Sequence, residues 1–111
     1  MRKTRRILKS QEFQKIINQK KFASSPSLVV YVNERNENIS RIGISVGKRV
    51  GNAVMRNKCK RQLRMMLDEL VPITDQRDYI ILARADYFNY SYEDNKKQLE
   101  NLLKKIKIKG K

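Results

Sequence analysis

A segment in the middle of the chain, Gly47 to Leu67, carries seven lysines and arginines and no acidic residue. Arg56, Lys60 and Arg64 recur every four residues, so a helix places them in one row along its side. Like charges at this spacing repel one another, and nothing acidic in the segment compensates. Successive side chains in such a row rise about 6 Å along the axis, close to the spacing of phosphates along a single nucleic-acid strand. The segment therefore predicts a polyanionic partner.

Residues for other kinds of chemistry are scarce. The chain has no histidine, which removes His-based triads, imidazole acid/base catalysis and the usual zinc sites. Its one cysteine, Cys59, excludes an intramolecular disulfide and lies on an apolar stripe, where we expect it to be buried. The acids that might hold a catalytic metal are scattered rather than convergent: Asp68, Glu69, Asp75, Asp78 and Asp86. We predict no catalytic residue and no metal site on the protein.

The loop before the basic helix, GKRVGN at residues 47–52, contains two glycines and the cations Lys48 and Arg49. Free amide groups at a helix start attract anions, and Asn52 is a favourable N-cap. The spacing matches neither GxxxxGK[ST] nor GxGxxG, so it does not indicate a nucleotide site. The loop is expected to add to the phosphate-binding surface.

The composition sets the class of protein. At 111 residues the chain fits a single domain, residues 1–111, and its net charge of +15 again favours nucleic acid as the partner. It contains no apolar run of the roughly 18 to 20 residues that a spanning helix needs, so we expect a cytoplasmic protein without membrane contact. Residues 1–9 are predicted to form a basic arm and residues 107–111 a basic tail.

The first half of the chain predicts one helix and two strands. Apolar residues at helical spacing indicate a short helix over residues 10–19. Residues 27–33 are rich in β-branched residues and predict a strand, and a further strand can fit between Phe22 and Val32. The alternation in residues 41–46 is typical of a half-buried strand, which we expect to pair in antiparallel fashion.

The second half predicts a helix, a strand and a helix. The basic helix begins after Asn52, ends before Pro72 and carries an apolar stripe. The compact apolar run of residues 78–85 suits a central strand, and Ser91 with Asp94 resembles a capping box at the start of a last helix. The order α-β-β-(β)-α-β-α predicts a two-layer α+β sandwich.

Three aromatic residues offer faces for unpaired bases: Phe13, Phe22 and Tyr31. For Phe13, on the apolar face of its helix, core packing and base contact are equally compatible with the pattern. Tyr31 alternates with Val30 and Val32, and we expect its ring to face RNA.

The stretch GISVGKRVGNAVMRNKCKRQLR, Gly43 to Arg64, resembles the signature of the protein component of bacterial ribonuclease P. The positions that match this signature are Gly43, Ser45, Val46, Lys48, Arg49, Gly51, Asn52, Ala53, Val54, Arg56, Asn57, Lys60, Arg61 and Arg64. Four other stretches are also similar to the family: SQEFQKII, SLVVYV, RDYIILAR and SYEDNKKQLENLLKKI.

The resemblance implies an accessory protein subunit of an endoribonuclease. In that family a catalytic RNA with bound Mg²⁺ removes the 5′ leader from precursor tRNA, so the implied partners are ribonuclease P RNA and precursor tRNA. No cofactor on the protein and no obligate protein partner are expected. The resemblance also implies a left-handed βαβ crossover, against the usual right-handed rule.

Site residues follow from the same resemblance. A cleft between the first helix and the sheet would receive the leader through Phe13, Ile17 and Tyr31. The surface facing the catalytic RNA would comprise Lys48, Arg49, Asn52, Arg56, Asn57, Lys58, Lys60, Arg61 and Arg64.

Two positions depart from the family pattern. Lys58 replaces an arginine, which keeps the charge and loses the planar fork, and Ile17 replaces a frequent aromatic residue and cannot stack.

The alternative to this function is a ribosomal or DNA-binding protein whose basic helix enters a groove. Composition alone favours that class, but no turn joining two recognition-type helices is recognisable.

Overall fold

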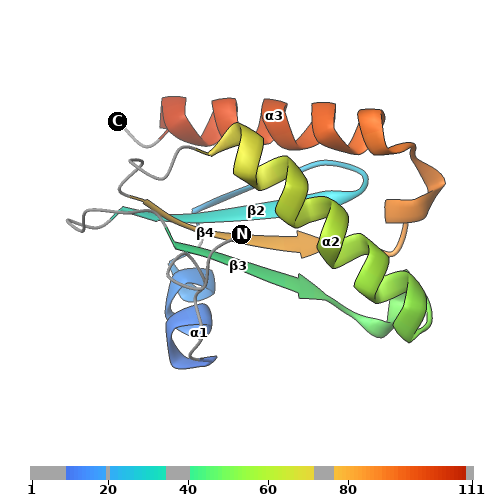
Figure 1. Ribbon diagram of the computed structural model, residues 1–111. Coiled ribbons are helices and arrows are strands. Elements are labelled where there is room, and N and C mark those ends of the chain that lie inside the picture. Colours follow the sequence, from blue (N-terminus) through green and yellow to red (C-terminus); the bar gives the residue numbers. More distant parts are fainter. Residues whose placement is uncertain (1–9, 20, 35–40, 72–76, 110–111) are drawn as a thin grey trace.

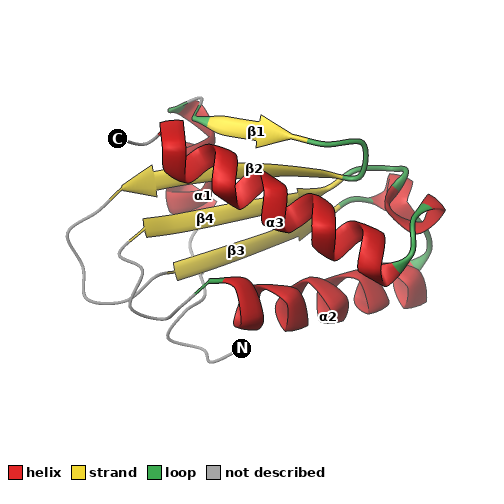
Figure 2. Cartoon of the chain, turned by 90° about the horizontal axis from the view of Figure 1, so that it is seen from above, coloured by secondary structure: helices red, strands yellow, loops and turns green. Residues whose placement is uncertain are grey.

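The computed structural model describes residues 10–19, 21–34, 41–71 and 77–109. They form a four-stranded sheet with α2 and α3 on one face and α1 on the other (Figures 1 and 2). The elements in chain order are α1 (Ser10–Asn18), β1 (Phe22–Ser24), β2 (Leu28–Glu34), β3 (Arg41–Val46), the 3₁₀ turn η2 (Lys48–Val50), α2 (Ala53–Leu70), β4 (Arg77–Ala83), the 3₁₀ turn η3 (Tyr87–Asn89) and α3 (Tyr92–Lys109). The predicted α+β class is confirmed, and β1 is the additional strand for which the sequence left room.

The strand order in the sheet is β1-β2-β4-β3. β2 pairs in antiparallel fashion with both β1 and β4, whereas β3 pairs with β4 alone, in parallel. The prediction of an antiparallel strand at residues 41–46 was therefore wrong. Alternation shows that one face of a strand is buried and does not reveal the direction of its neighbour. The central position predicted for β4 is confirmed.

The connection from β3 through α2 to β4 is left-handed. In Figure 2, β3 and β4 both point to the right, and β4 lies above β3. Between them the chain returns through α2 on the viewer's side of the sheet, the side that also carries α3. A right-handed twist of the strands normally favours the opposite hand, so this crossover is an exception to that rule.

The main core lies between the sheet and the pair α2 and α3. Alternate residues of β2 and β4 point into it, and helical spacing does the same for the two helices. Its buried members from the four elements are Leu28, Val30, Val32, Tyr79, Ile81, Cys59, Leu63, Met66, Leu67, Leu99, Leu102, Leu103 and Ile106. The predicted apolar stripe of the basic helix and the burial of Cys59 are confirmed.

Local signals fix where the helices begin. Gly51 has φ of +156°, and a Cβ there would lie 2.8 Å from the Cβ of Met55, so glycine alone fits this turn. The Asn52 side chain caps α2 by accepting a hydrogen bond from the Met55 N–H at 3.0 Å. At α3, Ser91 Oγ accepts from the Asp94 N–H at 3.1 Å. Both predicted helix starts are confirmed.

Parts of two predictions lie outside the described residues. The basic arm at residues 1–9 is one, and residues 110–111 of the basic tail are the other, while α3 itself continues to Lys109. Among the helices that the structure describes, none has the length and apolar character needed to cross a bilayer.

Candidate nucleic-acid interface

The basic row predicted on α2 is present along the flank of the helix. Arg56, Lys60 and Arg64 are half-buried, because the opposite side of the helix packs on the sheet. Within the described residues, none of their side chains forms an ion pair or a hydrogen bond, and the buried Nε of Arg56 has no hydrogen-bond partner there. Half-burial limits their conformational freedom while their charges stay uncompensated, as suits a surface that meets phosphates.

The remaining candidates on α2 are more exposed. Asn57 and Arg61 lie on the outer side, further round from the row, as the sequence predicts. Lys58 is also exposed, and its Nζ lies 5.9 Å from the ring centroid of Phe88, a cation–π arrangement. This contact orients Lys58, the position that departs from the family pattern, toward the 3₁₀ turn after β4. The side-chain oxygen of Asn52 accepts the capping bond that fixes the start of α2, and the amide NH2 of this exposed residue is the group that can donate to a phosphate.

A pocket of about 420 Å³ lies at the ends of β3 and β4. Because these strands are parallel, the loops that follow them meet at one edge of the sheet. The pocket takes three cations from these loops, Lys48, Arg49 and Arg84, and a single acid, Asp86. Lys48 and Arg49 are thus brought together with a third basic residue, and the pocket attracts anions.

Arg84 was missed by the sequence analysis. It directly follows a central strand, a position that carries no signal by itself, and only pairing with β3 brings it to the loop of Lys48 and Arg49. Its Nη1 donates a hydrogen bond to the Ser25 carbonyl oxygen at 3.3 Å, and its backbone N–H donates to the Ser27 carbonyl oxygen at 2.9 Å. These bonds hold the residue at the pocket wall.

On the opposite face of the sheet, α1 packs through a small cluster of its own. Its buried centre is Ile16 against Ile80 of β4. Around that centre lie partly buried side chains that we call the α1 seam: Phe13, Ile17, Tyr31 and Leu82. The three residues expected to bind a leader are therefore brought together between α1 and the sheet. Each keeps part of its side chain accessible, and for Phe13 the structure shows packing and exposure at once.

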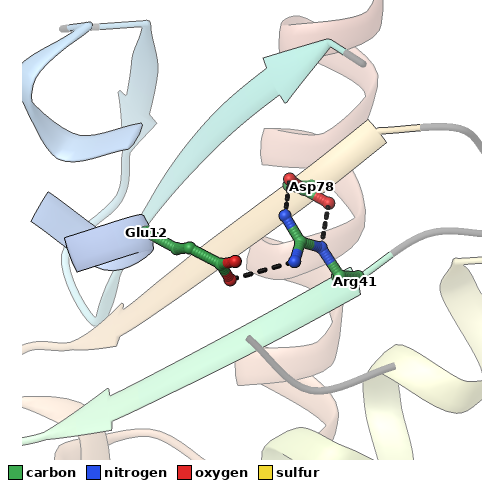
Figure 3. Close-up of polar contacts among 3 residues, drawn as sticks. All are labelled: Glu12, Arg41 and Asp78. Atoms are coloured by element: carbon green, nitrogen blue, oxygen red, sulfur yellow. Dashed lines mark hydrogen bonds and ion pairs between the residues drawn. The ribbon is translucent and has the colours of Figure 1, made fainter. Parts of the chain in front are cut away.

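An ion-pair bridge fastens α1 to the sheet (Figure 3). Arg41 of β3 donates from Nε and Nη2 to the two carboxylate oxygens of Asp78 at 3.2 and 3.0 Å, and from Nη1 to Glu12 of α1 at 2.9 Å. The Asp78 side chain is fully buried, and its hydrogen bond raises the pKa of Arg41. The bridge sets the position of α1, and with it the α1 seam.

The side chain of Cys59 is buried, and this environment does not activate its thiol. Removal from water raises the pKa of its thiol to about 12, although the nearby charge of Lys60 opposes the shift. Over the described ranges, no group of three or more Cys, Asp or Glu side chains is placed to hold a metal ion.

Comparisons with known proteins agree with this arrangement. The sequence matches the family described as Ribonuclease P over residues 1–107. It is 43% identical over 109 residues to the ribonuclease P protein component of Mycoplasma capricolum, covering 96% of this chain and 100% of the relative. The corresponding protein of Mesoplasma florum is 39% identical over 105 residues, covering 93% and 96%.

A solved structure of a variant of the Staphylococcus aureus RNase P protein superposes with a TM-score of 0.86 at 34% identity, covering 95% of this chain and 90% of that one. Both the sequence and the fold are therefore shared over nearly the whole length. The family match and the curated relatives take precedence over the alternative of a ribosomal or DNA-binding protein. The chain belongs to the ribonuclease P protein family.

Proposed function

We propose that this chain works as the accessory protein of a ribonucleoprotein endonuclease, binding the 5′ leader of precursor tRNA while ribonuclease P RNA cleaves it. Association with that RNA follows from membership in the family. Hydrolysis is assigned to the RNA and to Mg²⁺ that the RNA binds, and the reaction is placed in the cytoplasm. The protein contributes by neutralising phosphates and holding the substrate in position, tasks that need cations and apolar faces rather than a nucleophile.

The α2 flank is assigned to the catalytic RNA. Arg56, Lys60 and Arg64 supply charge along one line, and no acid among the described residues pairs with them. The cations of the pocket, Lys48 and Arg49, continue this surface to the edge of the sheet. RNA binding is therefore expected to depend steeply on salt, since each phosphate that the protein neutralises releases counterions.

The α1 seam is assigned to the leader. Phe13, Ile17 and Tyr31 gather on the face of the sheet opposite to α2, so the protein can hold the leader on one face while the other meets the catalytic RNA. The proposal rests on the presence of an aromatic surface on one face of the sheet and a cationic surface on the other. Stacking on a ring needs an unpaired base, which a single-stranded leader has and a folded tRNA body largely hides.

The test compares two substrates of the reconstituted ribonucleoprotein, a precursor tRNA with a leader and the same tRNA without one. We expect tighter binding of the leader-bearing form, and we expect Tyr31→Ala to remove most of that difference without weakening the binding of the protein to ribonuclease P RNA. Tyr90→Ala, a partly buried tyrosine outside the α1 seam, is the matched control. Equal affinity for the two substrates would reject the leader assignment.

A further inference from the structure

Phe22 is an exposed aromatic residue on the edge strand β1. Three large apolar side chains are exposed among the described residues, Phe22, Val54 and Met65, and Phe22 is the one that carries an aromatic ring. It is 47% exposed. β1 has a neighbour on one side only, so nothing in the sheet covers Phe22 toward the edge (Figure 2).

The ring of Phe22 continues the α1 seam. Phe22 pairs with Tyr31 in the register of β1 and β2, so both side chains point to the face that carries α1. Their ring centroids are 5.3 Å apart and the planes are inclined by 37°. Tyr31 packs against the same buried pair, Ile16 and Ile80, as Phe13 and Ile17 do. A continuous apolar and aromatic surface thus runs from α1 across β2 to the free edge of β1.

The charges beside this surface favour a nucleic acid as its occupant. Lys21, directly before Phe22, is exposed, and the chain as a whole has 26 lysines and arginines and a net charge of +15. A strand of RNA presents phosphates to such lysines and unpaired bases to the rings, whereas an apolar peptide would satisfy the rings alone.

We propose that Phe22 is an additional base-stacking site, which takes an unpaired nucleotide of the leader beyond those held at the α1 seam. The inference rests on the proposed function of the seam. In the tilted pair of Phe22 and Tyr31, the Phe22 ring lies nearer the free edge of the sheet and can stack on a base. The protein therefore contacts a longer stretch of leader, one that extends as far as β1. Loss of one stacked base lowers affinity by about fivefold or more.

The experiment measures affinity of the reconstituted ribonucleoprotein for precursor tRNAs whose leaders are shortened one nucleotide at a time. Phe22→Ala and Phe22→Leu should each weaken binding at least about fivefold, but only for leaders long enough to reach β1. Phe22→Tyr should bind as the wild type does, because it keeps the ring. Ser24→Ala, an exposed change on the same strand and face, is the control and should leave affinity unchanged.

A fluorescent variant gives a direct readout. The chain contains no tryptophan, so Phe22→Trp introduces a single indole. Its emission should be quenched by long leaders and not by short ones, because stacking brings a base against the ring.

Several outcomes would overturn the inference: Leu as effective as Phe, equal losses at every leader length, or a loss of the same size in Ser24→Ala. If the wild-type protein binds leader-bearing substrate more tightly and loses this preference on Tyr31→Ala, but the Phe22 variants bind as the wild type does, only the role of Phe22 is rejected. A wild type that does not discriminate leaders at all would reject the proposed function on which the inference rests.

Discussion

Arg41 donates hydrogen bonds to both carboxylate oxygens of the buried Asp78, its register partner in the parallel pair of β3 and β4. The third guanidinium nitrogen, Nη1, donates a hydrogen bond to Glu12 on α1. A residue at the start of an edge strand thereby connects the two strands of the crossover with the helix on the opposite face. In a chain so rich in cations, the charge of Arg41 is compensated by two carboxylates of the fold.

The first prediction concerns stability. Arg41→Ala should lower the free energy of unfolding by about 3 kcal/mol, because it removes from the buried Asp78 carboxylate the two charged hydrogen bonds that Arg41 donates. Urea denaturation measures this change. Glu12→Gln, which affects only the partly exposed ion pair between Glu12 and Arg41, should cost less than about 1 kcal/mol. A cost for Arg41→Ala as small as that for Glu12→Gln would show that the bridge does not stabilise the fold.

The sequence could not reveal this bridge, for a physical reason. Arg41 is 29 residues from Glu12 and 37 from Asp78, so no local pattern links the three side chains. Their meeting depends on β4 lying between β2 and β3, and alternation within a strand carries no information on its neighbours. Because the sequence of a strand does not reveal its neighbours, the prediction of antiparallel pairing was wrong and Arg84 was missed.

What could be predicted depends on local chemistry. Asn52 and Ser91 cap helices because their side chains reach amides three residues away, a relationship visible in the sequence. The apolar stripe around Cys59 follows from helical periodicity in the same way. The grouping of Phe13, Ile17 and Tyr31 came from the family resemblance, since residues on a helix and a strand cannot be placed side by side from periodicity alone.

The second prediction concerns the α2 flank. Arg56→Ala and Lys60→Ala should each weaken binding to ribonuclease P RNA. Each should also reduce the slope of log affinity against log salt by about 0.7 to 0.9 for every phosphate that the variant no longer neutralises. Binding titrations at several salt concentrations provide both quantities. Lys104→Ala, an exposed cation on α3, is the matched control. Slopes identical to the wild type would mean that neither residue meets a phosphate.

The third prediction concerns the pocket at the ends of β3 and β4. Arg84→Gln should weaken RNA binding and flatten its salt dependence, because it removes one of the three cations of the pocket. Asp86→Asn should have the opposite effect, since it removes the acid while keeping the oxygen that accepts from Asn89. Both variants are compared in the same titration. Changes of the same sign in the two variants would contradict an electrostatic role for the pocket.

The fourth prediction concerns pH. The thiol of Cys59, with a pKa raised by burial from its usual 9.0 to about 12, stays protonated in the folded chain at pH values where the unfolded chain loses that proton. The folded state then holds more protons, so the free energy of unfolding should fall as pH rises above about 9. Denaturation midpoints at increasing pH test this. In Cys59→Ala the decline should be shallower, and equal declines in both proteins would refute the contribution of this thiol.

In the proposed function, the protein assists an RNA that cleaves the substrate. The most direct measurement incubates precursor tRNA with a bacterial ribonuclease P RNA at low Mg²⁺, with and without this protein, and follows release of the leader. Site-specific leader removal should be markedly faster with the protein, and the gain should be smaller with the double variant Arg56→Ala, Lys60→Ala. No gain in correct cleavage on adding the wild-type protein would contradict this role.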